Sequence, residues 1–427
     1  MICKEFPAIG EHFYEEKLEN GLLVRVIERP GFAKKLAFAA VDYGANDLRF
    51  TFEGKKYDTP AGVAHYLEHK MFDLPDGNAM QLFARFGGSD NAFTTSSMTA
   101  YFVECTELFE ENLSVLLKLV TTPYFTQESV EKERGIIAQE IRMYDDNADS
   151  AVQEQLMAAV YRNHPCRVPV AGTTESIEGI SAETLHDCFR AFYALSNMMI
   201  CVIGDVQAEA VIEQIRRETP AGYVEPPVRD YGAPEEMTCA QDYTEKTMEV
   251  SRPTFAIGFK CDLPESGAAG MREECRALLA AEILIGESAP LYTTLYAEGL
   301  IDGDFSMDYE FLRGAATLIA SGDSDDPRQV MERLIAEAQR LGTEGVDEKL
   351  LSRLKKSTLG RKLRELDSFD SICFRMCSYH FDGAEYFDYP TVYESVTKDD
   401  VEQFLRDFVK KERAALSVIL PGKENAQ

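Results

Sequence analysis

The sequence is poor in positive charge and lacks long apolar runs. It has 44 lysines and arginines against 73 aspartates and glutamates, which gives a formal net charge of −29. A chain this acidic repels phosphate backbones and anionic lipid surfaces, so neither nucleic acid nor membrane is an expected partner. Its longest apolar stretches, such as residues 277–285, fall well short of the roughly 20 residues that a membrane-crossing helix needs.

Several sequence signals of other protein classes are also missing. The first residues contain no apolar core of the length that a secretory signal requires, so we expect a cytoplasmic protein. Ten cysteines at irregular spacing predict reduced, buried thiols; for the one close pair, Cys373 and Cys377, core packing is favoured over metal binding. Neither a Gly-x4-Gly-Lys-Ser/Thr loop nor a Gly-x-Ser-x-Gly elbow occurs, so nucleotide hydrolysis and serine-hydrolase chemistry have no support.

The chain is long enough for two or three domains, and its 45% hydrophobic content is that of a globular protein. Four of its 17 prolines (220, 226, 227 and 234) fall in one short stretch near mid-chain. Such a stretch disfavours helices and central strands and is typical of an extended linker. The sequence therefore predicts a first domain over residues 1–217, a linker over 218–240 and a second domain over 241–427.

An internal duplication supports this division. Residues 180–192 align without a gap with residues 396–408, where Ser181 and Thr397 both have the character of helix N-caps. The same offset aligns the apolar strands predicted over 199–203 and 415–419, and those over 39–43 and 255–259. Helices and strands mix within each half, so we expect two similar α+β domains.

The sharpest signal in the chain is a pair of histidines with a glutamate between them. Thr59 and Pro60 suit the N-cap and the first position of a helix, which would place His65 and His69 four residues apart on one face. Two imidazoles at that spacing can bind one metal ion, and Glu68 lies close enough to act as a base on a metal-bound water.

A catalytic zinc site usually has three protein ligands, so a third must come from elsewhere. Glu133 and Glu140 lie two turns apart on a helix predicted over 129–144 and project from nearly the same side. One could bind the metal while the other orients a ligand. A solvated acidic helix is the alternative; together with the histidine pair, the pattern favours Glu140 as the ligand.

The order His-x-x-Glu-His followed about seventy residues later by Glu-x6-Glu resembles that of the pitrilysin, insulin-degrading enzyme and mitochondrial-processing peptidase family, the inverzincin zinc metallopeptidases. Residues 18–22, 91–101 and 193–204 are also similar to segments of that family. Residues 65–72 and 139–146 look closest to a short bacterial branch of paralogous pairs that is associated with the aminopentanol modification of elongation factor P.

The resemblance implies two duplicated domains, each a mostly antiparallel sheet with helices packed on one side, in a clam-shell arrangement. It implies a zinc-dependent endopeptidase with one Zn²⁺ per chain, which cleaves peptides or extended protein segments with metal-activated water. The implied roles are metal ligation by His65, His69 and Glu140, general base catalysis by Glu68, orientation of the site by Glu133, and substrate contact by Asn91 and Ala92.

Two departures from the family pattern concern the second half. Where the family has Leu-Arg-x-Lys-x-Gly-Leu-x-Tyr, residues 295–302 place Tyr296 and Asp302 at the Arg and Tyr positions. The family's Arg and Tyr stabilise the carbonyl oxygen of the substrate. The candidates for that role here are Tyr292, Tyr296, Tyr309 or a group of a partner subunit. At the offset of the duplication, Ala281 and Ile285 replace the histidines, so only the first domain is expected to hold metal.

These departures leave a second function open, a non-catalytic or partner-dependent subunit of a heterodimeric processing peptidase. In either case we expect a homodimer, or a heterodimer with an inactive paralogue.

Overall fold

A computed structural model describes residues 1–422, which form two compact units. Unit 1 consists of residues 1–141, 169–231 and 365–381, and unit 2 of residues 142–168, 232–364 and the segment from 382 onward. Each unit is built around one large β-sheet with helices, and unit 1 also has two small sheets, β12-β5-β6 and β7-β8, so the predicted α+β fold is confirmed. Among the described residues, no helix has the length and apolarity that a bilayer crossing requires.

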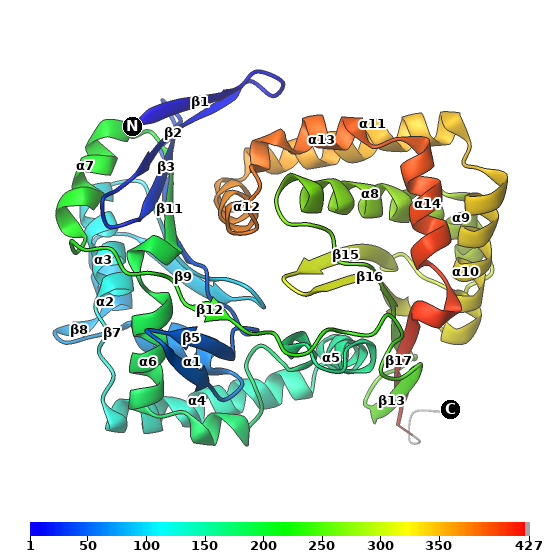
Figure 1. The fold of residues 1–427 in the computed structure, drawn as a ribbon, viewed down its shortest axis with the longest axis horizontal. Coiled ribbons are helices and arrows are strands. Elements are labelled where there is room, and N and C mark those ends of the chain that lie inside the picture. The colour runs from blue at the N-terminus through cyan, green and yellow to red at the C-terminus, as the bar shows by residue number, and fades with distance from the viewer. Residues whose placement is uncertain (423–427) are drawn as a thin grey trace. The chain divides into compact units, whose positions relative to one another are not determined.

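The sheet of unit 1 has seven strands in the order β1-β2-β3-β11-β4-β10-β9 (Figure 1). All neighbours pair antiparallel except β3 and β11, which are parallel. The strands in this spatial order are Ile2–Phe6, Glu11–Lys17, Leu23–Glu28, Met198–Gly204, Lys35–Val41, Thr99–Cys105 and Ser89–Thr94. Strand β9 is therefore at one edge of the sheet.

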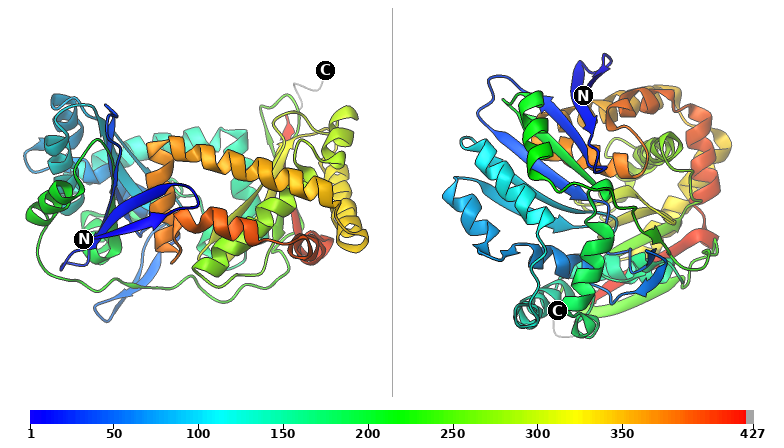
Figure 2. Two further views of the ribbon diagram at one scale, coloured as in Figure 1. Left: turned by 90° about the horizontal axis from the view of Figure 1, so that it is seen from above. Right: turned by 60° about the vertical axis from the view of Figure 1, so that its left-hand side comes forward.

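One face of this sheet is covered by α1 (Val63–Met71), α3 (Phe109–Thr121), α6 (Ala182–Phe192) and α7 (Ala208–Glu218). Figures 1 and 2 show α3 and α7 on the same side of the strands. Alternate residues of β4, Ala37, Ala39 and Val41, enter one core with these helices, as the period of a strand requires. Other elements of unit 1 are α2 Ala79–Arg85, β5 Arg49–Phe52, β6 Lys55–Asp58, β7 Asp73–Leu74, β8 Gly77–Asn78, β12 Val228–Arg229 and the first part of α4 Gln127–Asp145.

The sheet of unit 2 has the order β13-β17-β14-β16-β15. Its strands in this order are Tyr243–Met248, Ala414–Pro421, Thr254–Lys260, Ala315–Asp323 and Ser306–Leu312. The helices of this unit are α5 Ala148–Val160, α8 Ala268–Ile285, α9 Pro290–Ala297, α10 Pro327–Glu344, α11 Glu348–Arg364, α13 Tyr389–Ser395 and α14 Lys398–Phe408.

The two sheets share one topology, because the order β13-β17-β14-β16-β15 corresponds strand for strand to β3-β11-β4-β10-β9. The starts of α6 and α14, and those of β11 and β17, are related by the offset that the sequence predicts. The third aligned segment is displaced: Met198 pairs with Val41, whereas Ala414 pairs with Phe259 rather than with Ile257, the residue at the same offset from Val41. A displacement by two positions preserves which face each side chain occupies.

Each sheet also carries, on its second face, a helix from the other half of the chain. Helix α12 (Phe369–Phe381) packs against β11 and β4 in unit 1, where the Cys373 and Cys201 Sγ atoms lie 3.3 Å apart. Helix α5 packs against β17 and β14 in unit 2. All ten cysteines are free thiols, and eight of them are buried.

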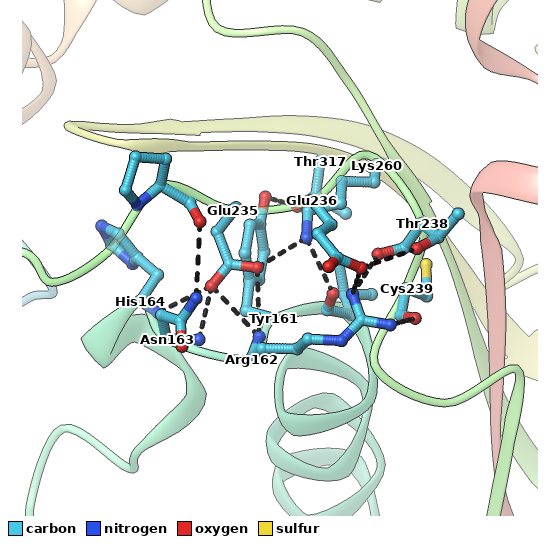
Figure 3. A network of polar contacts seen from close by, with 12 residues as sticks. Tyr161, Arg162, Asn163, His164, Glu235, Glu236, Thr238, Cys239, Lys260 and Thr317 are labelled. Carbon is cyan, nitrogen blue, oxygen red and sulfur yellow. Dashed lines mark hydrogen bonds and ion pairs between the residues drawn. The ribbon is translucent and has the colours of Figure 1, made fainter.

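A buried ion pair fixes residue 235, in the predicted linker, within unit 2 (Figure 3). The Glu235 carboxylate accepts hydrogen bonds from the backbone N–H groups of Arg162, Asn163 and His164 and from Lys260 Nζ at 2.8 Å. Lys260 is only 2% exposed, so this carboxylate is its counter-ion. Burial alone would raise the pKa of Glu235, but these donors lower it to about 2.

Candidate metal centre

Helix α1 carries the predicted histidines, but it begins later than the sequence suggests. Its N-cap is Gly62, whose φ of 88° is in the left-handed region, and a Cβ there would lie 2.3 Å from the carbonyl oxygen of Ala171. Thr59 instead donates its hydroxyl to the carbonyl of Leu48 at 2.9 Å. The expected capping by Thr59 is therefore wrong, because the chain turns into the helix through a glycine that the sequence pattern does not single out.

The predicted metal ligands do come together. His65 and His69 lie on one face of α1 with ring centroids 4.7 Å apart, and Glu140 reaches both from α4. Glu140 Oε1 is 3.6 Å from His65 Nε2, and Glu140 Oε2 is 3.4 Å from His69 Nε2. Within residues 1–422 this is the one group of three potential ligands whose donor atoms all lie within 4.8 Å of one another.

These separations suit zinc. Ligand atoms about 2.1 Å from a tetrahedral ion lie roughly 3.4 Å from one another, close to both nitrogen-to-oxygen distances. Two imidazole nitrogens and one carboxylate oxygen are also a donor set that catalytic zinc uses, with a fourth position left for water. Both nitrogen-to-oxygen separations, one to each oxygen of the Glu140 carboxylate, are thus near the spacing of two ligands on one tetrahedral ion.

Glu133 supports the histidine pair from one side. Its Oε1 lies 3.1 Å from His69 Nδ1, on the ring edge opposite the nitrogen that faces Glu140. A carboxylate in this position fixes the tautomer and the orientation of a metal-ligating histidine. Burial alone would lower the pKa of His69, but Glu133 and the charges of Glu68 and Glu140 raise it. The three carboxylates therefore create a site whose electrostatics favour a cation.

Glu68 is 8% exposed and is held by a threonine. Thr94, the last residue of β9, donates its hydroxyl to Glu68 Oε2 at 2.6 Å. Burial raises the pKa of Glu68, and the Thr94 hydrogen bond opposes that rise. Because Glu68 lies between His65 and His69 on α1, its carboxylate projects from the same helical turn as the two rings.

The predicted substrate residues lie on β9, the strand that ends at Thr94. Its backbone pairs with β10, and the other edge of the strand faces away from the sheet. Ala92 turns its methyl group into the unit 1 core, so only its backbone is available for contact. The backbone N–H of Ala92 donates to the side chain of exposed Asn91 at 2.9 Å and is thus directed to the open edge.

A cavity of about 480 Å³ lies on the opposite face of this edge. Phe93 of β9 and Phe374 of α12 meet there with their ring centroids 5.7 Å apart. The complete lining is Phe38, Phe93, Phe102, Glu365, Asp370, Ser371, Phe374 and Arg375. Aromatic walls with a few charged groups suit an apolar side chain.

The tyrosines considered for the second half differ in accessibility. Tyr292 and Tyr296 stack on α9 with ring centroids 6.1 Å apart, and Tyr296 is 56% exposed. Tyr309 is 9% exposed and lies on β15, where its hydroxyl has no hydrogen-bond partner within the described part of the chain. Tyr309 is therefore closed to a ligand, whereas Tyr296 is accessible.

Sequence reasoning missed two residues that organise the site. One is Thr94; the other is Tyr66, whose hydroxyl donates to the carbonyl of Val130 and so ties α1 to α4. Strand alternation indicates that Thr94 shares a face with Ala92, but not that this face meets α1. The roles of Thr94 and Tyr66 both depend on contacts between segments that are distant in the sequence.

Comparison with known proteins identifies the family. The family model Insulinase (Peptidase family M16) matches residues 53–174, and the model Peptidase M16 inactive domain matches residues 179–358. The protein named uncharacterized zinc protease YmfH of Bacillus subtilis is 36% identical over 423 residues, which cover 98% of both chains. The chain therefore belongs to peptidase family M16, the insulinase family, and the predicted resemblance is confirmed.

Other relatives agree with this assignment. An M16-like peptidase from Alicyclobacillus acidocaldarius has a solved structure with a TM-score of 0.92 and 30% identity, covering 96% of this chain and 98% of that one. A probable mitochondrial-processing peptidase subunit beta of Arabidopsis thaliana is 27% identical over 205 residues, 47% of this chain and 37% of that protein. The finer resemblance to the branch associated with elongation factor P stays a prediction.

Proposed function

We propose that this protein is a zinc-dependent endopeptidase that binds one Zn²⁺ per chain and cleaves peptides or extended protein segments. The observation that carries the proposal is the convergence of His65, His69 and Glu140, with a further acid, Glu68, on the same turn of α1. Relatives that are named zinc proteases support the same chemistry.

In this proposal His65, His69 and Glu140 hold the metal and Glu133 orients the ring of His69. Bound zinc lowers the pKa of a coordinated water and polarises a carbonyl oxygen. Glu68 would take a proton from the attacking water as the water oxygen bonds to the peptide carbonyl carbon, and would pass that proton to the nitrogen that leaves when the C–N bond breaks. Its burial suits both steps, because a carboxylate with a raised pKa accepts and returns a proton more readily near neutral pH.

The open edge of β9 is the proposed substrate platform. A peptide added there as a further strand would hydrogen-bond to the backbone of Ala92 and displace the Asn91 side chain from its N–H. Strand alternation would then direct every second substrate side chain toward the face that carries Phe93 and the cavity. Backbone recognition of this kind selects extended chains rather than one sequence.

The proposed setting is a reducing compartment, for which ten free thiols are suited, and hence the cytoplasm. The proposed assembly is a homodimer or a heterodimer with an inactive paralogue. An Arabidopsis relative that is named as a subunit of a processing peptidase supports the idea of a partner.

The test combines metal analysis with peptide cleavage. The purified chain is assayed on a mixed pool of quenched peptides, with and without a chelator, beside Glu68→Gln and the control Glu131→Gln, an exposed residue of α4. We expect one zinc per chain in all three proteins, and chelator-sensitive cleavage in all but Glu68→Gln. Zinc without cleavage would favour the partner-dependent subunit, and a chain that binds no zinc would refute the proposal.

A further inference from the structure

We infer that Thr94 is a positioning residue for the general base, because its hydroxyl holds the Glu68 carboxylate in the orientation that proton transfer requires. This inference rests on the proposed function, since it assigns a partner to Glu68 in that reaction. The carrying observation is the 2.6 Å hydrogen bond from Thr94 Oγ to Glu68 Oε2. A short bond to an ionised acceptor is stronger than a neutral one.

The bond selects which carboxylate oxygen is used. Because Thr94 is directed to Oε2, the remaining oxygen, Oε1, is the one that takes the proton. Glu68 is only 8% exposed, so bulk water does not readily replace the hydroxyl if it is removed. Without Thr94 the carboxylate would be free to rotate about its last side-chain bond, a torsion that has broad minima.

A second hydroxyl, that of Thr99, lies beside Thr94. Thr94 Oγ lies 3.4 Å from Thr99 Oγ, and Thr99 in turn donates to the carbonyl of Tyr43 at 2.8 Å. A hydroxyl both donates and accepts. The Thr99 hydrogen is thus directed to Tyr43 and the Thr94 hydrogen to Glu68 Oε2, which leaves Oε1 for the proton.

The hairpin that follows Thr94 is fixed on two sides. Residues 95–98 form its loop, in which Thr95 N donates to the carbonyl of Met98 at 2.7 Å. The neighbouring loop donates to it through Ala45 N and Asn46 N, at 2.9 Å each. At Gly44 a Cβ would lie 2.4 Å from the backbone nitrogen of Ser97, so this close approach requires glycine. Thr94 thus belongs to a rigid part of unit 1.

This placement couples substrate alignment to the base. Thr94 follows Ala92 by two residues on the same face of β9, a distance of roughly 7 Å along a strand. The pairing register of a peptide added to the edge of β9 is therefore set by the same strand whose Thr94 holds Glu68. The scissile bond and the base are then aligned by one rigid element rather than by two.

The test compares Thr94→Val, which keeps the shape and removes the hydroxyl, with Thr94→Ser, which keeps the hydroxyl. The matched control is Thr254→Val in unit 2, where Thr254 also donates to a carboxylate, Asp323, at 2.8 Å. We expect kcat to fall about tenfold or more in Thr94→Val, with KM and zinc content unchanged. Thr94→Ser should recover most of the rate, and Thr254→Val should retain the wild-type kcat.

A readout independent of activity accompanies the kinetics. Crystal structures of the metal-free variants should show one Glu68 carboxylate orientation in the wild type and Thr94→Ser, and more than one in Thr94→Val. A wild-type kcat in Thr94→Val, or an equal loss in Thr94→Ser, would overturn the inference while leaving the proposed function intact. Failure of the wild type itself to cleave any peptide would instead count against the proposed function.

Discussion

Replacing Glu235 with glutamine removes the counter-ion of buried Lys260 while preserving the shape of the side chain, which is only 9% exposed. The pKa of Glu235 lies at about 2 against an ordinary value of 4.5, because Lys260 and three backbone N–H groups outweigh the effect of burial. At about 1.36 kcal/mol for each unit of pKa shift, this difference between the folded and ordinary pKa corresponds to about 3 kcal/mol of stability. Loss of one partner from a buried ion pair has a cost of about 3–5 kcal/mol, which agrees in size.

The sign of the pH dependence follows from the lowered pKa. The contribution of Glu235 is fully present above pH 4.5, where the unfolded residue is ionised, and it disappears as the pH falls toward 2. Urea unfolding of Glu235→Gln and the wild type should therefore differ by about 3 kcal/mol at pH 7 and converge only as the pH falls to about 2. The assay follows the unfolding transition of unit 2 at several pH values.

A neighbouring residue supplies the control. Glu236 pairs with Arg162 at 3.4 Å, but its side chain is 72% exposed, so Glu236→Gln should change the unfolding free energy by less than about 0.5 kcal/mol. The double variant Glu235→Gln/Lys260→Met should regain much of the loss, because no unpaired charge then remains. An equal effect of Glu235→Gln and Glu236→Gln, or one independent of pH, would refute the reasoning.

Three further predictions concern the metal site and its surroundings. Glu133→Gln should weaken zinc affinity about 10- to 100-fold in a competitive chelator titration, whereas Glu131→Gln should not; equal affinities would contradict the orienting role. Gly62→Ala should lower both the melting temperature and zinc occupancy, because its φ is positive and Ala171 blocks a Cβ; unchanged melting would show that the helix start tolerates the strain. Phe93→Ala should raise KM for peptides with apolar side chains while zinc content stays the same, and an unaltered KM would exclude the cavity from substrate binding.

Local patterns account for what the sequence predicts correctly. Helices α6 and α14 are capped by Ser181 and Thr397, whose side chains accept from backbone N–H groups inside the first turn. Capping and an apolar face at helical spacing are properties of a single segment, so one sequence is sufficient to recognise them. The spacing of His65 and His69 is equally local.

Tertiary contacts account for what the sequence does not predict. The apolar faces of α5 and α12 indicate that each helix is covered, but not by which sheet. The constant offset that marks the duplication also fails where residues are inserted, as the different pairing of Val41 and Phe259 shows. Likewise, the contact between Thr94 and Glu68 follows only from the packing of β9 against α1.

The second half shares the sheet topology of the first but has no histidine pair at the aligned positions, so the role of the histidine spacing can be tested there. At the constant sequence offset, Ala281 and Ile285 align with the two histidines; they lie on α8 and are 3% and 4% exposed. The same offset places Lys349 and Lys356 on α11 where Glu133 and Glu140 lie on α4.

The double variant Ala281→His/Ile285→His should therefore still bind one zinc per chain. Two imidazoles would enter buried positions of α8, and the α11 residues that align with Glu133 and Glu140 are lysines rather than acids, so the melting temperature should fall. Metal analysis and thermal unfolding of this variant test the argument. A second bound zinc would show that the histidine spacing alone builds the site, and that the acids of the partner helix are dispensable.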